Sequence, residues 1–170
     1  MSDSRKQPVA KSGYKAPAKP RRKEFQGVRI AVLATRWNVE IVAALLVGAR
    51  RCLEDWGVLS DNVSVQYVPG AFELPLAAEA LMGSGRHDGV VTLAAVIRGD
   101  TPHFELVAGE CARGLREASQ RYCMPLGFGV LAVNTVQQAV ERAGPGRDNK
   151  GYEAVAATLE MIRMLRTIDG

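Results

Sequence analysis

The sequence predicts an α/β domain in three layers, in which helices cover both faces of a four-stranded parallel sheet. Two observations support this fold class. Short apolar segments alternate without interruption with longer segments whose apolar residues recur at helical spacing. The chain has 170 residues, which suits a single domain, and 47% of them are hydrophobic, as in an ordinary globular protein.

The predicted strands are short and strongly apolar. Residues 28–34 (VRIAVLA) and 89–97 (GVVTLAAVI) are nearly continuous apolar runs, which are typical of strands buried on both faces of a parallel sheet. Residues 63–68 alternate in character, and residues 126–133 (LGFGVLAV) complete the sheet. Because parallel strands end at the same edge, we expect the segments that follow them to hold any ligand.

Helical spacing of apolar residues predicts five helices, over residues 39–56, 72–82, 102–122, 134–142 and 152–166. Gly57 suits the residue that ends the first helix, because glycine adopts the left-handed conformation without strain. Pro102 suits the first turn of the third helix, where a main-chain N–H is not needed. Asn134 is expected to cap the fourth helix, and residues 144–150 are expected to form a loop.

A basic segment precedes the predicted domain. Residues 1–26 carry eight basic and two acidic side chains, a net charge of +6, so the other residues carry −2 of the total charge of +4. The segment has three prolines and almost no large apolar residue, so we expect a disordered tail, followed by one domain at residues 27–170. A basic arm for nucleic acid and a solubilising tail without a partner both fit this charge. We favour the second and expect no nucleic-acid binding.

Several classes of protein are not expected. No apolar run approaches the ~18 residues of a membrane span, and without an apolar segment near residue 1 we expect no secretory signal. Both observations favour a cytoplasmic protein without a membrane partner. The three cysteines, Cys52, Cys111 and Cys123, form no C-x-x-C pair. We therefore expect buried thiols in a reducing compartment, without a disulfide framework or a metal site.

The segment after the third strand carries the strongest chemical signal. Gly99, Asp100 and Thr101 lie between a buried strand and a helix start, where main-chain N–H groups and the helix dipole favour an anion such as phosphate. His103 falls in the first turn of that helix. A general acid–base role near neutral pH and a simple hydrogen bond to the helix start both fit this position.

Other strand ends carry further candidates. Trp37 follows the first strand, where its ring suits stacking on a planar heterocycle, whereas Trp56, on the first helix, is expected to pack in the core. Glu73 suits hydrogen bonds to a polyol, but a carboxylate at a helix start needs no ligand, and we favour that interpretation. Arg142 has a planar donor fork suited to phosphate, and Lys150 either adds charge to an anion site or is a solvated loop lysine.

Together these segments resemble the motifs of the lumazine synthase family, in the family's order, from about Val28 to the C-terminus. The matching strings are TRWN (35–38), VPGAFELP (68–75), VIRGDTPHF (96–104), FGVL (128–131), ERAG (141–144) and NKG (149–151). The segment before Gly27 lies outside the resemblance. Trp37 departs from the phenylalanine of many members, and Asn134 stands where an acidic residue is frequent.

The resemblance implies a flavodoxin-like fold and an enzyme of riboflavin biosynthesis. Such an enzyme condenses 5-amino-6-(D-ribitylamino)uracil with 3,4-dihydroxy-2-butanone 4-phosphate to 6,7-dimethyl-8-ribityllumazine, and it uses no cofactor. The resemblance also implies a homopentamer with active sites between neighbouring subunits, which in some members assembles further into a decamer or an icosahedral 60-mer. A functional link to riboflavin synthase follows from the shared pathway.

The resemblance further implies a role for each candidate residue. His103 would transfer protons. The residues that would bind the pyrimidine and its ribityl chain are Trp37, Ala71, Phe72, Glu73, Val96, Ile97, Phe128 and Lys150. The residues that would bind the phosphate are Gly99, Asp100, Thr101 and Arg142. The neighbouring subunit would supply Phe128, Arg142, Lys150 and Glu153.

Two alternatives from other classes remain open. The first is a weakly catalytic paralogue that binds riboflavin or lumazine, which the large ring of Trp37 would favour. The second is a shell protein whose basic tail recruits cargo. An intact set of His103, Arg142 and Lys150 favours the enzyme over both.

Overall fold

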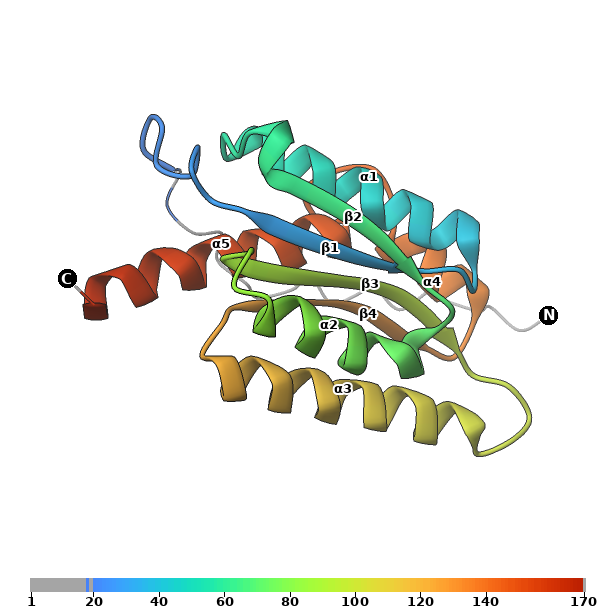
Figure 1. The fold of residues 1–170 in the computed structure, drawn as a ribbon. Helices are drawn as coiled ribbons and strands as arrows, with labels where there is room; N and C mark the ends of the chain where they lie inside the picture. Colours follow the sequence, from blue (N-terminus) through green and yellow to red (C-terminus); the bar gives the residue numbers. More distant parts are fainter. Residues whose placement is uncertain (1–17, 19, 170) are drawn as a thin grey trace.

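The computed structural model describes residue 18 and residues 20–169. Its strands are β1 (Ile30–Thr35), β2 (Val63–Val68), β3 (Gly89–Ile97) and β4 (Leu126–Val133). They form one sheet in the order β2-β1-β3-β4, and each neighbouring pair is parallel (Figure 1). The predicted four-stranded parallel sheet is therefore confirmed.

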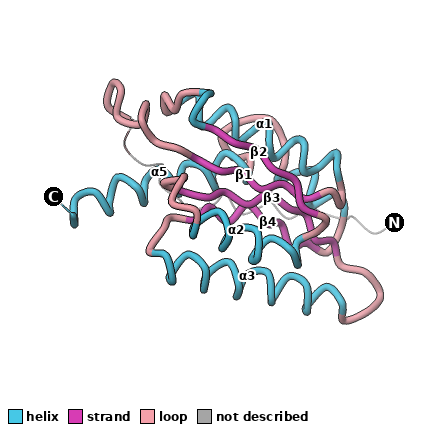
Figure 2. Tube along the Cα trace, in the orientation of Figure 1, coloured by secondary structure: helices cyan, strands magenta, loops and turns pink. Residues whose placement is uncertain are grey.

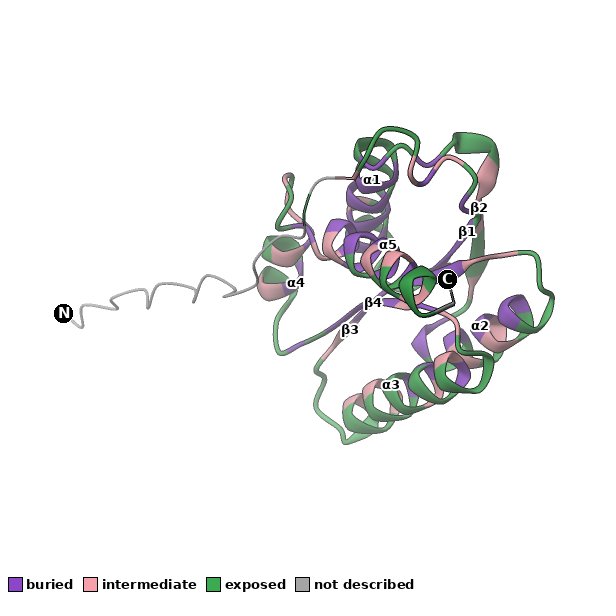
Figure 3. Ribbon diagram, turned by 90° about the vertical axis from the view of Figure 1, so that its left-hand side faces the viewer, coloured by how far each residue is buried: buried purple, intermediate pink, exposed green. Residues whose placement is uncertain are grey.

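Helices cover both faces of this sheet (Figure 2). The α-helices are α1 (Val39–Asp55), α2 (Leu74–Gly83), α3 (His103–Tyr122), α4 (Val136–Arg142) and α5 (Lys150–Asp169). The short 3-10 helices are η1 (Ser60–Asn62) and η2 (Ala71–Glu73). Helices α1, α4 and α5 pack on one face of the sheet, and α2 and α3 pack on the other (Figure 3). The predicted three layers are confirmed.

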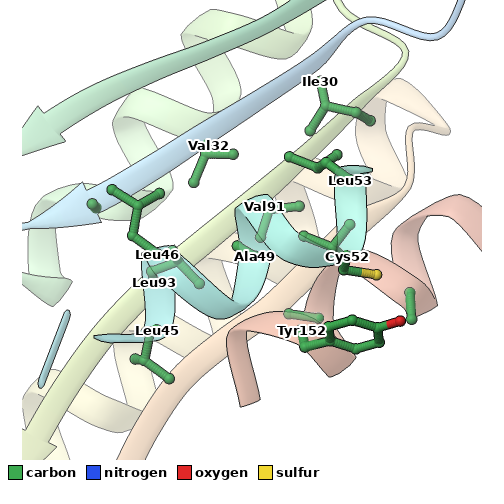
Figure 4. Close-up of a cluster of buried hydrophobic side chains, with 14 of the residues drawn as sticks. Ile30, Val32, Leu45, Leu46, Ala49, Cys52, Leu53, Val91, Leu93 and Tyr152 are labelled. Carbon is green, nitrogen blue, oxygen red and sulfur yellow. The ribbon is translucent and has the colours of Figure 1, made fainter. Parts of the chain in front are cut away.

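The central strand β1 is buried on both faces, as its apolar run predicted. Ile30 and Val32 point into the core beneath α1 and α5, to which α1 contributes Leu45 and Leu53 (Figure 4). Leu33 points into the second core, beneath α2 and α3. Burying each such side chain stabilises the fold by about 1.5–3 kcal/mol. The two cores cover both faces of the sheet, and the loops that follow the strands lie at its carboxyl edge.

Element boundaries differ from the prediction at several points, and three of the differences have a clear local reason. β1 begins at Ile30 rather than at Val28, because the Val28 N–H is used in a turn. α4 is capped by the Thr135 hydroxyl, which accepts a main-chain N–H of the first turn at 3.2 Å, rather than by Asn134. α5 begins at Lys150, two residues earlier than predicted, because the preceding side chain caps it.

The described part of the predicted tail packs against the domain. Phe25 is fully buried, and its ring centre lies 5.4 Å from that of Trp56, which confirms that Trp56 packs in the core. Arg163 of α5 donates to both carboxylate oxygens of Glu24, at 2.6 and 3.1 Å. The packed part of the chain therefore begins before residue 27. The prediction for residues 1–17 and 19 lies outside the described residues.

The cysteines follow the expectation in two of three cases. Cys52 and Cys111 are buried, and burial raises the pKa of their thiols to about 12 and about 11. Cys123, at the end of α3 with φ of 48°, is exposed, contrary to the prediction. Over the described residues, no helix has the length and apolar character of a membrane span. Nor does that part of the chain gather three potential metal ligands of the His, Cys, Asp or Glu type.

Candidate active site at the carboxyl edge of the sheet

The strand order identifies the place on the sheet where a ligand is expected to bind. The chain leaves β1 through α1 toward β2, on one side, and leaves β3 through α3 toward β4, on the other. In doubly wound sheets, ligands bind outside the carboxyl ends of the two strands at which the order reverses. Trp37 and His103 lie in the segments that follow β1 and β3, so the structure places both at this switch point.

Trp37 lies at this edge with 73% of its surface exposed. Hydrogen bonds anchor the residues on both sides of Trp37. The Arg36 N–H donates to the Val68 carbonyl at 3.1 Å, and Nδ2 of Asn38 donates to the Ala95 carbonyl at 2.8 Å. These bonds join the loop after β1 to both neighbouring strands. A large ring that is exposed on an anchored loop is suited to stacking on a ligand.

The segment after β2 brings Glu73 to the same place. A Cβ on Gly70 would lie 3.1 Å from Cδ1 of Trp37 and 3.2 Å from Oε2 of Glu73, so both side chains approach the same bare backbone. Phe72 is 61% exposed and Ala71 is buried. Glu73 precedes α2 but makes no capping hydrogen bond to it. An aromatic platform and a carboxylate that accepts hydrogen bonds therefore lie side by side.

Val96 and Ile97 end β3 within the switch point, but they point to opposite faces of the sheet. Val96 packs against the core beneath α2 and α3, whereas Ile97 packs against the core beneath α1 and α5. Both are half-buried. The structure therefore brings them to the same strand end, but not to the same face.

The loop after β3 leads to an open helix start. Gly99, Asp100 and Thr101 are exposed, and the 20-residue helix α3 begins at His103. No described side chain caps this helix, and the bond from the His103 N–H to the Thr101 hydroxyl is 3.5 Å long, at the limit of a hydrogen bond. Main-chain N–H groups and the dipole of a long helix are thus available to an anion. The imidazole of His103 is exposed beside them.

Arg98, which we did not predict as a site residue, anchors both ends of this loop. Its N–H donates to the Val133 carbonyl at 2.9 Å, and its Nε donates to Oδ1 of Asn134 at 2.9 Å. Its guanidinium pairs with Glu105, and its Cζ lies 4.3 Å from the centre of the Phe104 ring. The hydrogen bond from Arg98 lowers the pKa of Glu105. The loop is anchored at its ends while the residues between the anchors stay exposed.

The remaining predicted residues form a second group, around β4 and the α4–α5 junction. Arg142 donates to the Gln138 carbonyl of its own helix at 3.0 Å, and Nζ of Lys150 pairs with Glu153 at 2.5 Å. Phe128 is 49% exposed on β4, five residues before that strand ends, which is roughly 16 Å from the carboxyl edge. Within the described ranges, no hydrogen bond or ion pair joins the side chains of this group to those of Trp37, Glu73 or His103. One chain therefore presents the predicted site in two halves.

Sequence reasoning also missed Asn149, which it assigned to a loop. The side chain is buried and caps α5. The signal was present, because an asparagine directly before a segment of helical periodicity is a common helix-start residue.

A cavity of about 250 Å³ lies at the opposite, amino edge of the sheet. It is lined by His87, Asp88, Tyr122, Cys123, Met124, Pro125, Ile162, Leu165 and Arg166. None of the predicted site residues lines it, and the Asp88 carboxylate is already paired with Arg29 at 2.8 Å. We assign this cavity no part in the chemistry of the carboxyl edge.

The order β2-β1-β3-β4, the helices on both faces, and the aromatic and polar side chains at the switch point define a flavodoxin-like α/β protein. Comparison with known proteins makes the class specific. Residues 27–166 match the family model of 6,7-dimethyl-8-ribityllumazine synthase. A 6,7-dimethyl-8-ribityllumazine synthase of Desulfovibrio desulfuricans is 46% identical over 145 residues, which are 85% of this chain and 93% of that protein. The chain belongs to the 6,7-dimethyl-8-ribityllumazine synthase family, which confirms the resemblance of its motifs.

Proposed function

We propose that this protein condenses 5-amino-6-(D-ribitylamino)uracil with 3,4-dihydroxy-2-butanone 4-phosphate to 6,7-dimethyl-8-ribityllumazine, with release of phosphate and water. It is thus a transferase of riboflavin biosynthesis. The observation that carries the proposal is the exposed Trp37 ring beside the Glu73 carboxylate, next to the uncapped start of α3. A heterocycle with a polyol chain and a phosphate ester need these features close together. Membership of the family supports the same reaction.

The pyrimidine occupies the half of the site that β1 and β2 build. Trp37 stacks on the ring, and the carboxylate of Glu73 accepts hydrogen bonds from the ribityl hydroxyls, each of which is a donor. The side chains that surround the ring are those of Ala71, Phe72, Val96 and Ile97.

The ketose phosphate occupies the half that β3 and α3 build. Main-chain N–H groups of Gly99, Asp100 and Thr101 bind the phosphate at the start of α3, and the guanidinium of Arg142 from a neighbouring chain completes its charge balance. This arrangement holds the ketone of the ketose beside the amino group of the pyrimidine, which supplies much of the rate.

His103 moves the protons. The pyrimidine amine attacks the ketone carbon, the nitrogen loses a proton, and the carbonyl oxygen leaves as water to give an imine. Loss of a proton beside the imine expels phosphate and, after tautomerisation, leaves a carbonyl that the ribityl-bearing nitrogen attacks with loss of water. No step is an oxidation or reduction by an external agent, so the reaction needs no redox cofactor. An imidazole suits these transfers because it accepts and donates protons near neutral pH.

A neighbouring copy of the same chain completes the site with Phe128, Arg142 and Lys150, together with Glu153. Two features support a homo-oligomer. In the described part of one chain, the side chains of Arg142, Lys150 and Phe128 make no hydrogen bond or ion pair with those of Trp37, Glu73 or His103. Val136 and Val140, four residues apart on one face of α4, are also 58% and 49% exposed, as at a contact between chains. We propose a homopentamer, with a decamer or a 60-mer as further assemblies. In the cytoplasm, riboflavin synthase would take up the product.

A spectroscopic assay tests the reaction. The pure protein is mixed with both substrates, and lumazine absorbance is followed. We expect a protein-dependent rise, and for Arg142→Ala a loss of about 10- to 100-fold in kcat/KM for the ketose phosphate, the value of a charge-assisted hydrogen bond of about 1.5–3 kcal/mol. Arg147→Ala is the matched control, because Arg147 lies in the same α4–α5 connection and is only loosely paired, 3.9 Å from Asp55. Equal losses in both variants would contradict the assigned role of Arg142.

A riboflavin- or lumazine-binding protein with little activity is the second candidate, and the exposed Trp37 ring favours it. No absorbance rise from folded, assembled protein would select this candidate. It then predicts that riboflavin quenches the tryptophan fluorescence of the wild type more strongly than that of Trp37→Phe, in which Trp56 is the one remaining tryptophan.

A further inference from the structure

The junction between α4 and α5 is built around one buried side chain, Asn149, which is 3% exposed. Its Nδ2 donates to the carbonyls of Ala143, Gly144 and Ala44, at 2.9, 3.0 and 3.1 Å. The first two carbonyls follow α4, and the third belongs to α1. The nitrogen end of this amide therefore ties the end of α4 to α1.

The oxygen end of the same amide starts α5. Oδ1 of Asn149 accepts the N–H groups of Gly151 and Tyr152 at 2.8 and 3.2 Å. Such N–H groups at a helix start have no partner within the helix. The nitrogen faces carbonyls and the oxygen faces N–H groups, so the amide has one satisfactory orientation and only a side chain with both functions serves both ends.

Close packing holds the amide in place. A Cβ on Gly48 of α1 would lie 2.0 Å from Oδ1 of Asn149, and a Cβ on Gly151 would lie 2.0 Å from a main-chain carbonyl of α1. Tyr152, the third residue of α5, lies in the core beside α1 (Figure 4), and its hydroxyl donates to Asp55 at 2.9 Å. α1, the end of α4 and the start of α5 therefore form one closely packed unit.

Two cations of the proposed site flank Asn149. Arg142 precedes Ala143, whose carbonyl accepts from the amide, and Lys150 follows Asn149 directly. We propose that Asn149 is a positioning residue of the reaction: its amide holds Arg142 and Lys150 at a fixed separation, so that both face the substrates bound by the neighbouring chain. Asn149 itself touches no substrate and acts through these two side chains. This inference rests on the proposed function, in which both cations bind substrate.

Two substitutions of Asn149 distinguish the role of the amide nitrogen from that of the amide oxygen. Asn149→Ser keeps an oxygen that caps α5 but loses the donor that reaches the three carbonyls. Asn149→Asp keeps the shape and the cap but turns a carboxylate oxygen toward those carbonyls. Leu159→Ala is the matched control, because it removes a fully buried side chain of the same helix and destabilises the fold at a distance from the junction.

The measurements are kcat, the KM for the ketose phosphate and the inhibition constant of inorganic phosphate, with assembly checked by size-exclusion chromatography and stability by thermal unfolding. We expect Asn149→Ser to raise the KM and the inhibition constant about 10-fold while kcat stays within about twofold, and Asn149→Asp to raise them further. Leu159→Ala should lower the melting temperature at least as much and leave both constants unchanged.

Unchanged constants in Asn149→Ser, or equal changes in Leu159→Ala, would overturn the positioning role. So would a failure of Asn149→Ser to assemble while Leu159→Ala assembles, because Asn149 would then serve the fold. Arg142→Ala, measured alongside, separates this inference from the proposed function. If Arg142→Ala raises the constants and Asn149→Ser does not, only the inference about Asn149 fails. If neither does, the proposed phosphate site fails.

Discussion

At the amino edge of the sheet, charged side chains are joined to partners from distant parts of the chain. Arg29 donates to both carboxylate oxygens of Asp88, at 2.8 and 3.3 Å, and Arg163 binds Glu24 in the same way. At the carboxyl edge, the His103 imidazole makes no hydrogen bond or ion pair with another described residue. The ion pairs Arg29–Asp88 and Arg163–Glu24 at one edge of the sheet thus contrast with the His103 imidazole at the other edge, which remains available to a ligand.

The electrostatics of the amino edge follow from this pairing. The hydrogen bonds and charge of Arg163 lower the pKa of Glu24. Burial alone would raise the pKa of Asp88, but the hydrogen bonds and charge of Arg29 outweigh it and the net shift is downward. Such pairs favour the folded state, whereas a polar group without a partner contributes to binding only when a ligand arrives. Changes at the amino edge should therefore alter stability, and changes at the carboxyl edge should alter catalysis.

The largest effect is expected at His103. His103→Ala should lower kcat by about 100-fold or more, because a positioned acid–base group contributes about that much, and it should change KM less. The free energy of unfolding should stay within about 0.5 kcal/mol, as for an exposed side chain. Lumazine absorbance and chemical denaturation measure the two quantities. A large loss of stability with little loss of kcat would contradict the comparison.

The second test compares a buried ring at the amino edge with an exposed ring at the carboxyl edge. Phe25→Ala removes a fully buried ring and should lower the free energy of unfolding by about 3–4 kcal/mol, with kcat/KM unchanged in the folded protein. Phe72→Ala is the matched control, because Phe72 is 61% exposed at the carboxyl edge. It should leave stability nearly unchanged and raise the KM for the pyrimidine. Similar stability losses in both variants would show that exposure does not separate the edges.

A smaller effect is expected at Trp37. Trp37→Ala should raise the KM for the pyrimidine by up to about 10-fold, since stacking contributes about 0.5–1.5 kcal/mol beyond burial of area. Trp37→Phe, which keeps a stacking ring, should recover most of this loss. Steady-state kinetics with the ketose phosphate at saturation give the values. An unchanged KM in Trp37→Ala would show that the Trp37 ring does not stack on the pyrimidine.

The smallest effect is expected at His87, on the amino edge, whose Nε2 lies 3.1 Å from the Ser64 hydroxyl. Burial, with a smaller contribution from the charge of Arg86, lowers the pKa of His87. The unfolded chain therefore binds a proton below about pH 6.5 that the folded chain does not, so stability falls as pH drops through that range and is unaffected above it. In His87→Gln this loss between pH 7 and pH 5 should be reduced. If the free energy of unfolding of the wild type and of His87→Gln depended equally on pH, His87 would not cause the loss of stability.

The elements of the fold were predictable because their signals are local. The apolar run of β1 and the helical spacing of α1 depend on neighbouring residues, and Gly57, with φ of 75°, ends α1 as predicted. The misses were residues whose roles depend on partners. Phe25 was assigned to a tail because nothing nearby in sequence reveals that Trp56 covers it. Asn149 was assigned to a loop although its role as a helix cap had a local signal, but its bond to the Ala44 carbonyl of α1, about a hundred residues away, had none.

The sequence by itself determined the alternation of strands and helices, and with it the parallel sheet and the edge at which Trp37, Glu73 and His103 are placed. These follow from the period of apolar residues and from the common end of parallel strands. Only the tertiary structure decided that Trp37 and Glu73 meet over Gly70 and that one buried amide joins α1, α4 and α5. Those facts are distances between residues that are remote along the chain, and packing settles such distances where no local pattern records them.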